Sequence, residues 1–213
     1  MRLALAAAML IPIGAMVMGI RTGKFLWNIL LTLSCAAIVL LTGRGKPMIP
    51  LAFALVVSLA GDWFMAHKGG KQIRYILGIA LFLLGHAGFL WYALPRFAGD
   101  VRIWVSGAAL LGMIGFYFAK RIFPNLNMPM RIAVGAYALI SIASLVAAAG
   151  MRCPSEYEHI LYAFGILMIV ASDVMIAECD FAHDRTWSSF IMPLYYLCHI
   201  LVAASSVAGI GVA

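Results

Sequence analysis

Long apolar runs separated by short polar connections dominate the sequence. Each run approaches the roughly 20 residues that an α-helix needs to cross a bilayer. Hydrophobic residues make up 65% of the chain and charged residues 11%, whereas about a quarter of a soluble domain is charged. We therefore expect an all-α integral membrane protein, a bundle of about eight transmembrane helices. Their approximate ranges are 3–20, 25–42, 48–66, 73–94, 101–119, 131–149, 157–178 and 188–210.

The connections between these runs are too short to hold a separate soluble domain. We expect residues 1–213 to form a single polytopic transmembrane domain, with the first run kept as a helix and not removed as a signal peptide. No run alternates apolar and polar residues with a period of two, which excludes a β-barrel. Gly, Ala and Ser are abundant inside the runs, as close packing of membrane helices favours.

Basic residues outnumber acidic ones, with 15 Lys and Arg against 8 Asp and Glu. They lie in the connections, where they set orientation and contact anionic headgroups, so we expect a lipid bilayer as partner and no nucleic acid. With eight helices both termini share one face, and the opposite face carries nine basic residues against six. The positive-inside rule puts this more basic face in the cytoplasm, and we expect a multi-pass protein of a bacterial inner membrane. The oligomeric state stays open.

Some polar residues lie inside the apolar runs and not in the connections: Asp62, His86 and Asp173, and in the last run Tyr195, Tyr196 and His199. An Asp in the middle of a membrane helix costs about 2.5–3.5 kcal/mol on insertion scales, so it usually faces a cavity or a partner. Spacings of three and four residues put the tyrosines and the histidine of the last run on one helical face. All of these positions fall in the same half of the membrane. This indicates one shared cavity that opens toward the more basic face.

Each of these positions also has a purely structural explanation. Asp62 could accept hydrogen bonds from a neighbouring helix, or pair with Lys46 or Lys68. The two histidines could be packing residues with satisfied hydrogen bonds. Ser172 could bond to backbone, as serines in helices often do. Two buried carboxylates and two histidines at one depth nevertheless favour a site.

Motifs for the commonest nucleotide-driven and zinc-protease activities are absent. The sequence contains no Walker loop, GxGxxG, GxSxG or HExxH. Its four cysteines show no CxxC and no disulfide framework. We expect no cofactor and no bound metal.

Several motifs occur in an order that resembles the YhhN family of membrane lysoplasmalogenases, over about residues 40–205. They are Lys46-Pro47, Gly61-Asp62, Leu77-Gly78 with Phe82-Leu83 and His86, the Gly165–Asp173 helix with Ser172 and Ala177, and Leu194–His199. The chain departs from the family pattern where His199 replaces Gln, Leu194 replaces Thr and Phe89 replaces Tyr. These departures bear on substrate preference more than on the central acids.

The resemblance implies hydrolysis of the vinyl-ether bond of lysoplasmalogens to a fatty aldehyde and a glycerophospho-alcohol. Protonation of the β-carbon makes an oxocarbenium ion, which water attacks, as paired carboxylates allow in glycoside hydrolysis. We expect Asp62 and Asp173 to be this catalytic pair, with His86 relaying protons or orienting water. The lysophospholipid substrate is expected to contact Lys46 through its phosphate. The other expected substrate-binding residues are Ser172, Tyr195, Tyr196 and His199.

Two other functions fit the same residues. A metal-dependent lipid hydrolase could use the two histidines, the two aspartates and Ser172 to hold a zinc ion. A small proton-coupled transporter could use Asp62, His86 and Asp173 as a relay. Division of the helices into four plus four pairs the Gly61-Asp62 helix with the Ser172-Asp173 helix, which suggests an internal repeat.

Overall fold

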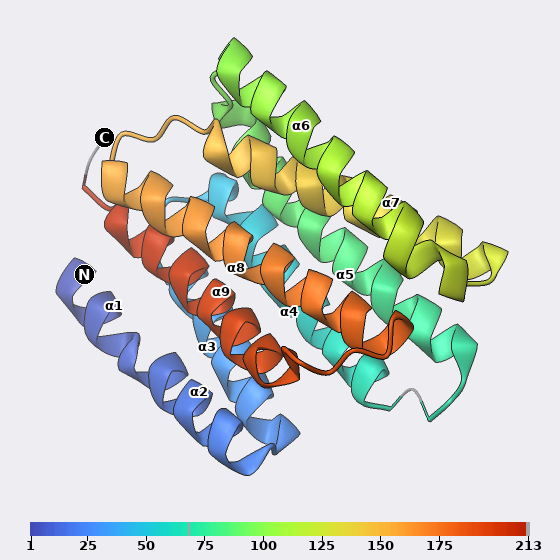
Figure 1. Ribbon diagram of the computed structural model, residues 1–213. Helices are drawn as coiled ribbons and strands as arrows, with labels where there is room; N and C mark the ends of the chain where they lie inside the picture. Colours follow the sequence, from blue (N-terminus) through green and yellow to red (C-terminus); the bar gives the residue numbers. More distant parts are fainter. Residues whose placement is uncertain (68, 212–213) are drawn as a thin grey trace.

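The computed structural model describes residues 1–67 and 69–211, and this part of the chain forms helices without any strand. Figure 1 shows them as a bundle. The α-helices are α1 (Arg2–Ala8), α2 (Leu10–Thr22), α3 (Phe25–Leu41), α4 (Ile49–Ala66), α5 (Gln72–Ala93), α6 (Val101–Tyr117), α7 (Met128–Ala149), α8 (Glu156–Phe181) and α9 (Ser188–Ala208). Short helices are η1 (Lys46–Met48), η2 (Leu94–Arg96), η3 (Phe118–Ile122, a π-helix) and η4 (Phe123–Asn125).

The expected transmembrane bundle is confirmed. Within the described residues, seven helical segments are long and apolar enough to cross a membrane, and α3 is a shorter apolar helix of 17 residues. The first expected run is divided at Met9 into α1 and α2. The fifth run extends beyond residue 119, because α6 continues through η3 and η4.

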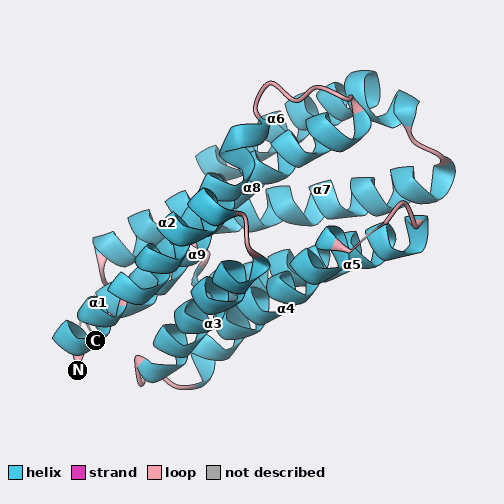
Figure 2. Cartoon of the chain, turned by 90° about the horizontal axis from the view of Figure 1, so that it is seen from below, coloured by secondary structure: helices cyan, strands magenta, loops and turns pink. Residues whose placement is uncertain are grey.

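Helices α1 and α2 run in the same direction and the later α-helices alternate, so that the N- and C-termini lie at the same end of the bundle (Figure 1). We call this the terminal end, and the other the opposite end. Helix α4 packs along α5, and α8 packs along α9. Helix α6 lies at the outside of the bundle against α7 (Figure 2). The interior is therefore built mainly by α4, α5, α8 and α9, with α3 and α7 beside them.

Small residues let α4 and α5 approach each other closely. A Cβ atom on Gly88 would lie 3.0 Å from both the Ala54 Cβ and the Pro50 carbonyl oxygen. A Cβ atom on Gly85 would lie 2.6 Å from the Ser58 Oγ. Such direct backbone contact is the usual way in which membrane helices associate. It fixes the position of α4 relative to α5, and hence of Asp62 relative to His86.

A buried polar cluster lies near the terminal end. Glu158 is fully buried and accepts two hydrogen bonds from the Arg44 guanidinium, of 2.7 and 3.1 Å, and one of 2.6 Å from the Tyr92 hydroxyl. The Arg96 guanidinium lies 4.3 Å from the centre of the Tyr92 ring. This cluster joins the starts of α4 and α8 to the end of α5.

Candidate active site

His86 and Asp173 meet in the interior of the bundle. The His86 Nε2 lies 3.0 Å from the Asp173 Oδ2, and the Nδ1 lies 3.1 Å from the Ser144 Oγ. The Ser144 hydroxyl can donate its only hydrogen to the Ser141 carbonyl oxygen over 2.8 Å, and in that arrangement the His86 Nδ1 is the donor to Ser144. One further proton then lies between the Nε2 and the carboxyl oxygen. His86 and Asp173 together hold a shared proton inside the bundle.

Asp62 is held by a second set of hydrogen bonds. Its Oδ2 accepts a bond of 2.8 Å from the Asn28 amide on α3 and one of 2.6 Å from the Tyr195 hydroxyl on α9. Asn28 also accepts a hydrogen bond from Thr32, one turn later on α3. Helices α3 and α9 supply the donors and α4 carries Asp62, so three helices together fix the direction of this carboxyl group. Both donors bind the same oxygen of the carboxyl group.

The two carboxyl groups lie close enough for their charges to interact. Asp62 is not among the described residues that line the cavity that Asp173 faces, whereas Phe82 lines it. Its ring lines this cavity, packs on Gly61 and lies edge-on to Tyr195, the donor to Asp62. The expected pair therefore shares one region, but the two carboxyl groups have different surroundings.

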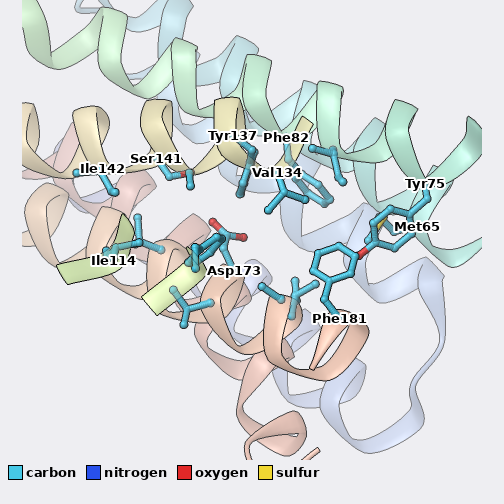
Figure 3. A pocket seen from close by; sticks show the side chains of 17 residues that line it. Met65, Tyr75, Phe82, Ile114, Val134, Tyr137, Ser141, Ile142, Asp173 and Phe181 are labelled. Atoms are coloured by element: carbon cyan, nitrogen blue, oxygen red, sulfur yellow. The ribbon is translucent and has the colours of Figure 1, made fainter. Parts of the chain in front are cut away.

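Asp173 points into an apolar cavity of about 70 Å³ between α5, α6, α7 and α8 (Figure 3). It is the only acidic residue among the described residues that line the cavity. Tyr137 and Ser141, one turn apart on α7, face the same space (Figure 3). The remaining walls are largely apolar, including Phe82, Ile114, Phe118 and Val134. A few converging polar groups in an apolar cavity are typical of a ligand site.

Two further cavities lie next to this space along α7, each sharing lining residues with it. A polar cavity of about 340 Å³ at the opposite end includes Lys71, Gln72 and Asn127, and shares Tyr75 and Phe181 with the Asp173 cavity. An apolar cavity of about 390 Å³ shares Ile142 with the Asp173 cavity and extends toward the terminal end. Its lining comes from α5, η2, α6, α7 and the segment between η2 and α6. The three cavities form a row, polar at one end and apolar at the other.

The structure brings together some of the expected substrate-binding residues and not others. Tyr195 contacts Asp62 directly. Ser172 is buried, but its hydroxyl donates to the Ile191 carbonyl oxygen, a bond of 3.0 Å between α8 and α9. Tyr196 packs against α2, because a Cβ atom on Gly19 would lie 3.1 Å from its ring. Ser172 therefore bonds to backbone, which is the structural explanation given for it above.

His199 lies behind Tyr195 and outside the cavities described above. Its Nδ1 donates to the Tyr195 carbonyl oxygen over 2.9 Å, and its ring contacts the Tyr195 ring at 4.5 Å. The Nε2 is buried, and no described residue forms a hydrogen bond with it. His199 therefore contacts Tyr195, which is the donor to Asp62.

Lys46 lies at the terminal end, away from both carboxyl groups. Sixteen residues separate it from Asp62 along η1 and α4, a distance of about 25 Å at the rise of an α-helix. It lines an exposed groove with Trp91 and Arg96. Lys68, the other cation considered for Asp62, lies outside the described residues. Asp62 is bound by neutral donors from α3 and α9, as the hydrogen-bonding explanation expected.

Sequence reasoning did not identify Asn28, Tyr137, Ser141 or Ser144. Asn28 carried a usable signal, since it is an amide inside an apolar run, as unusual there as an aspartate. Tyrosine and serine are common in membrane helices, so the three α7 residues carried none. Their spacing of three and four residues acquires meaning only when α7 is placed beside His86 and Asp173.

The zinc alternative requires ligands that converge on one point. Within residues 1–67 and 69–211, no group of three His, Cys, Asp or Glu side chains is arranged to hold a metal ion. His86 binds Asp173 directly, whereas His199 faces the Tyr195 backbone. The five candidate ligands, including Ser172, are therefore distributed over separate contacts.

Comparison with known proteins supports the resemblance. No curated protein and no solved structure gives a significant match to the chain. The YhhN family model, however, matches residues 23–206, which include α3 to α9 and every polar group of the site described above. On this match the chain belongs to the YhhN family.

Proposed function

We propose that the protein is a membrane-embedded hydrolase that cleaves the vinyl-ether bond of lysoplasmalogens. One observation carries the proposal: Asp173, sharing a proton with His86, is the carboxyl group that faces the central, apolar cavity of the row. Membership of the YhhN family is consistent with a membrane hydrolase. A protonated carboxyl group in an apolar cavity is suited to deliver a proton to carbon.

The reaction divides into proton transfer, water attack and collapse. Asp173 donates its proton to the β-carbon of the vinyl ether, which leaves an oxocarbenium ion beside a carboxylate. Water adds to the α-carbon and gives a proton back to Asp173, forming a hemiacetal. The hemiacetal then loses its hydroxyl proton while the glycerol oxygen gains one, and aldehyde and glycerophospho-alcohol separate. Overall one water is consumed, and the acid is regenerated with His86 as its partner.

Asp62 acts on this reaction through its charge. Asn28 and Tyr195 hold the carboxylate in place, and its charge interacts with Asp173. A fixed negative charge in a region of low dielectric constant stabilises a developing cation more strongly than the same charge in water. Asp62 therefore has the role of the second, ionised carboxylate. Phe82 keeps it out of direct contact with the lipid.

The row of cavities matches the shape of a single-chain lipid. The headgroup would lie in the polar cavity near Lys71, the vinyl ether at Asp173, and the alkenyl chain in the apolar cavity along α7. Helix positions 127 to 147 span about 30 Å, comparable to an extended lysolipid. The headgroup is thus assigned to the opposite end of the bundle and not to Lys46. The more basic face would point to the cytoplasm of a bacterial inner membrane.

The test is an assay of purified protein with vinyl-ether, ester and alkyl-ether lysolipids that share one headgroup. Release of aldehyde from the vinyl-ether lipid alone is expected, because only this bond forms an oxocarbenium ion on protonation of carbon. Cleavage of the ester lipid instead would contradict the proposal. Proton-coupled flux in proteoliposomes without bond cleavage would favour the transporter.

A further inference from the structure

Two hydroxyl groups in the Asp173 cavity have unused hydrogen-bonding capacity. The Tyr137 hydroxyl oxygen and the Ser141 Oγ are both buried, and neither has a hydrogen-bond partner within the described part of the chain. Ser141 is only 3% exposed. A buried hydroxyl without a partner loses the hydrogen bonds it would make in water, so such groups normally bind water or ligand. Here both line one cavity.

Both hydroxyl groups are held in place by contacts that leave their oxygen atoms available. The Tyr137 ring packs edge-on against the His86 ring, with centres 5.3 Å apart. Ser141 lies one turn further along α7, and its carbonyl oxygen, not its hydroxyl, accepts from Ser144. The Tyr137 hydroxyl also lies near the Asp173 carboxyl group and the Ser141 hydroxyl, without a hydrogen bond of good geometry to either. Figure 3 shows the carboxyl group of Asp173 pointing toward the α7 face that carries both hydroxyl groups.

The polar groups of His86 and Ser144 beside the cavity are already engaged. The His86 Nε2 and Nδ1 face Asp173 and Ser144, and the Ser144 hydroxyl is bound to the Ser141 carbonyl oxygen. The other cavity walls are predominantly apolar. A small polar molecule between them would satisfy both hydroxyl groups. The cavity of about 70 Å³ has room for a few waters, since one water needs about 10–15 Å³ of such space.

We propose that Tyr137 and Ser141 hold the water that attacks the substrate, on the face of α7 that meets Asp173. The role in attack rests on the proposed vinyl-ether hydrolysis. One of the two hydroxyl groups donates to the water oxygen and the other accepts a water hydrogen, while the second water hydrogen points to the Asp173 carboxylate and one lone pair of the water stays free to attack. After the proton has moved to the β-carbon, the water oxygen bonds to the α-carbon and its proton passes to Asp173. Tyr137 and Ser141 are positioning residues and exchange no proton with the lipid.

The first test is an experimental structure of the whole substrate-free protein, at a resolution that shows ordered water. It should contain a water within hydrogen-bond distance of the Tyr137 hydroxyl and the Ser141 Oγ. The water should be absent in a Tyr137→Phe and Ser141→Ala double variant, in which His86, Ser144 and Asp173 keep their positions. A dry cavity in the unmodified protein would overturn the inference, whether or not the protein hydrolyses lipid.

The second test measures whether methanol or water attacks the oxocarbenium ion when both are present. Attack by methanol converts the vinyl ether into a mixed methyl acetal, whereas attack by water gives the aldehyde. In Tyr137→Phe and Ser141→Ala the acetal-to-aldehyde ratio should rise several-fold, because the water is no longer held. Aldehyde release should fall about tenfold in each, the effect of one lost hydrogen bond of about 1 kcal/mol or slightly more.

Controls separate positioning from folding. Tyr157→Phe, at an exposed tyrosine, and Ser34→Ala, at a serine bonded to backbone on α3, should leave rate and ratio unchanged. An unchanged ratio in the Tyr137 and Ser141 variants would overturn the inference even if their rates fell. If the unmodified protein releases no aldehyde, the proposed function and the role in attack both fail, while the structure still decides the water site.

Discussion

The His86 Nε2 lies 3.0 Å from the Asp173 Oδ2, and this contact joins α5 to α8 inside the bundle. The hydrogen bond between these two atoms holds one shared proton. A proton kept in this way is available to a substrate without exchange with bulk water. The imidazole also fixes which oxygen of Asp173 remains directed toward the cavity.

Replacement of Asp173 tests the proton donor. Asp173→Asn should lower aldehyde release by about 10²–10⁴-fold, the usual contribution of a general acid, because an amide cannot deliver the proton. The matched control is Asp100→Asn. Asp100 caps the start of α6 by accepting from the Arg102 amide, and Asn caps helices equally well. Aldehyde release by Asp173→Asn at the unmodified rate would contradict the assignment.

Variants at two adjacent tyrosines distinguish the effect of the hydrogen bond to Asp62 from the effect of ring packing. Tyr195→Phe removes a hydrogen bond to a charged group, worth about 1.5–3 kcal/mol, so kcat should fall about 10–100-fold. Tyr196→Phe changes a ring that packs on α2 and should have little effect on kcat. Both should melt within a few degrees of the unmodified protein in detergent. Equal losses of kcat in the two variants would show that packing, and not the bond to Asp62, matters.

The Arg44–Glu158 pair near the terminal end is expected to control stability and not chemistry. Arg44→Met leaves Glu158 buried and charged, which costs about 3–5 kcal/mol, and the melting temperature should fall strongly. A second change, Glu158→Gln, removes that charge and should restore part of the loss. Thermal unfolding of single and double variants measures this. If the losses of stability in Arg44→Met and in Glu158→Gln simply add in the double variant, the pairing argument is refuted.

Close approach of α4 and α5 predicts sensitivity at Gly88. Gly88→Val pushes branched carbon atoms into Ala54 and the Pro50 carbonyl oxygen, and overpacking of this kind costs about 1–3 kcal/mol. Since α4 carries Asp62 and α5 carries His86, activity should fall even in protein that remains folded. Gly112→Val on α6 meets no atom within 4 Å and serves as the control. A melting temperature unchanged in Gly88→Val would argue against the tight α4–α5 contact.

Most of the fold was predictable, because each helix repeats the same apolar requirement for crossing a bilayer. The break at Met9 and the continuation of α6 through the π-helix were not, since both lie inside apolar sequence with no distinct local pattern. Asp62, His86 and Asp173 were found because ionisable groups are costly in such runs. Their partners were not, since the Asp62–Tyr195 and His86–Asp173 bonds join residues 133 and 87 positions apart.

Lys46 shows that a residue close to a site in sequence can lie far from it in the fold. It precedes the Asp62 helix in sequence, but a membrane helix carries the chain across the bundle before Asp62 is reached. Positions near the two ends of one such helix face different sides of the membrane. A contact between them would need a ligand that crosses most of the bilayer.

The order of the three cavities has a consequence for the fate of the products. In the proposed reaction the long aldehyde is released among apolar side chains on the α6–α7 side, and it dissolves in hydrocarbon. The glycerophospho-alcohol has lost its chain and leaves past Lys71 and Asn127 into water. The two products thus separate into different phases, where their recombination is negligible. Hydrolysis would then run in one direction without any conformational change to expel the products.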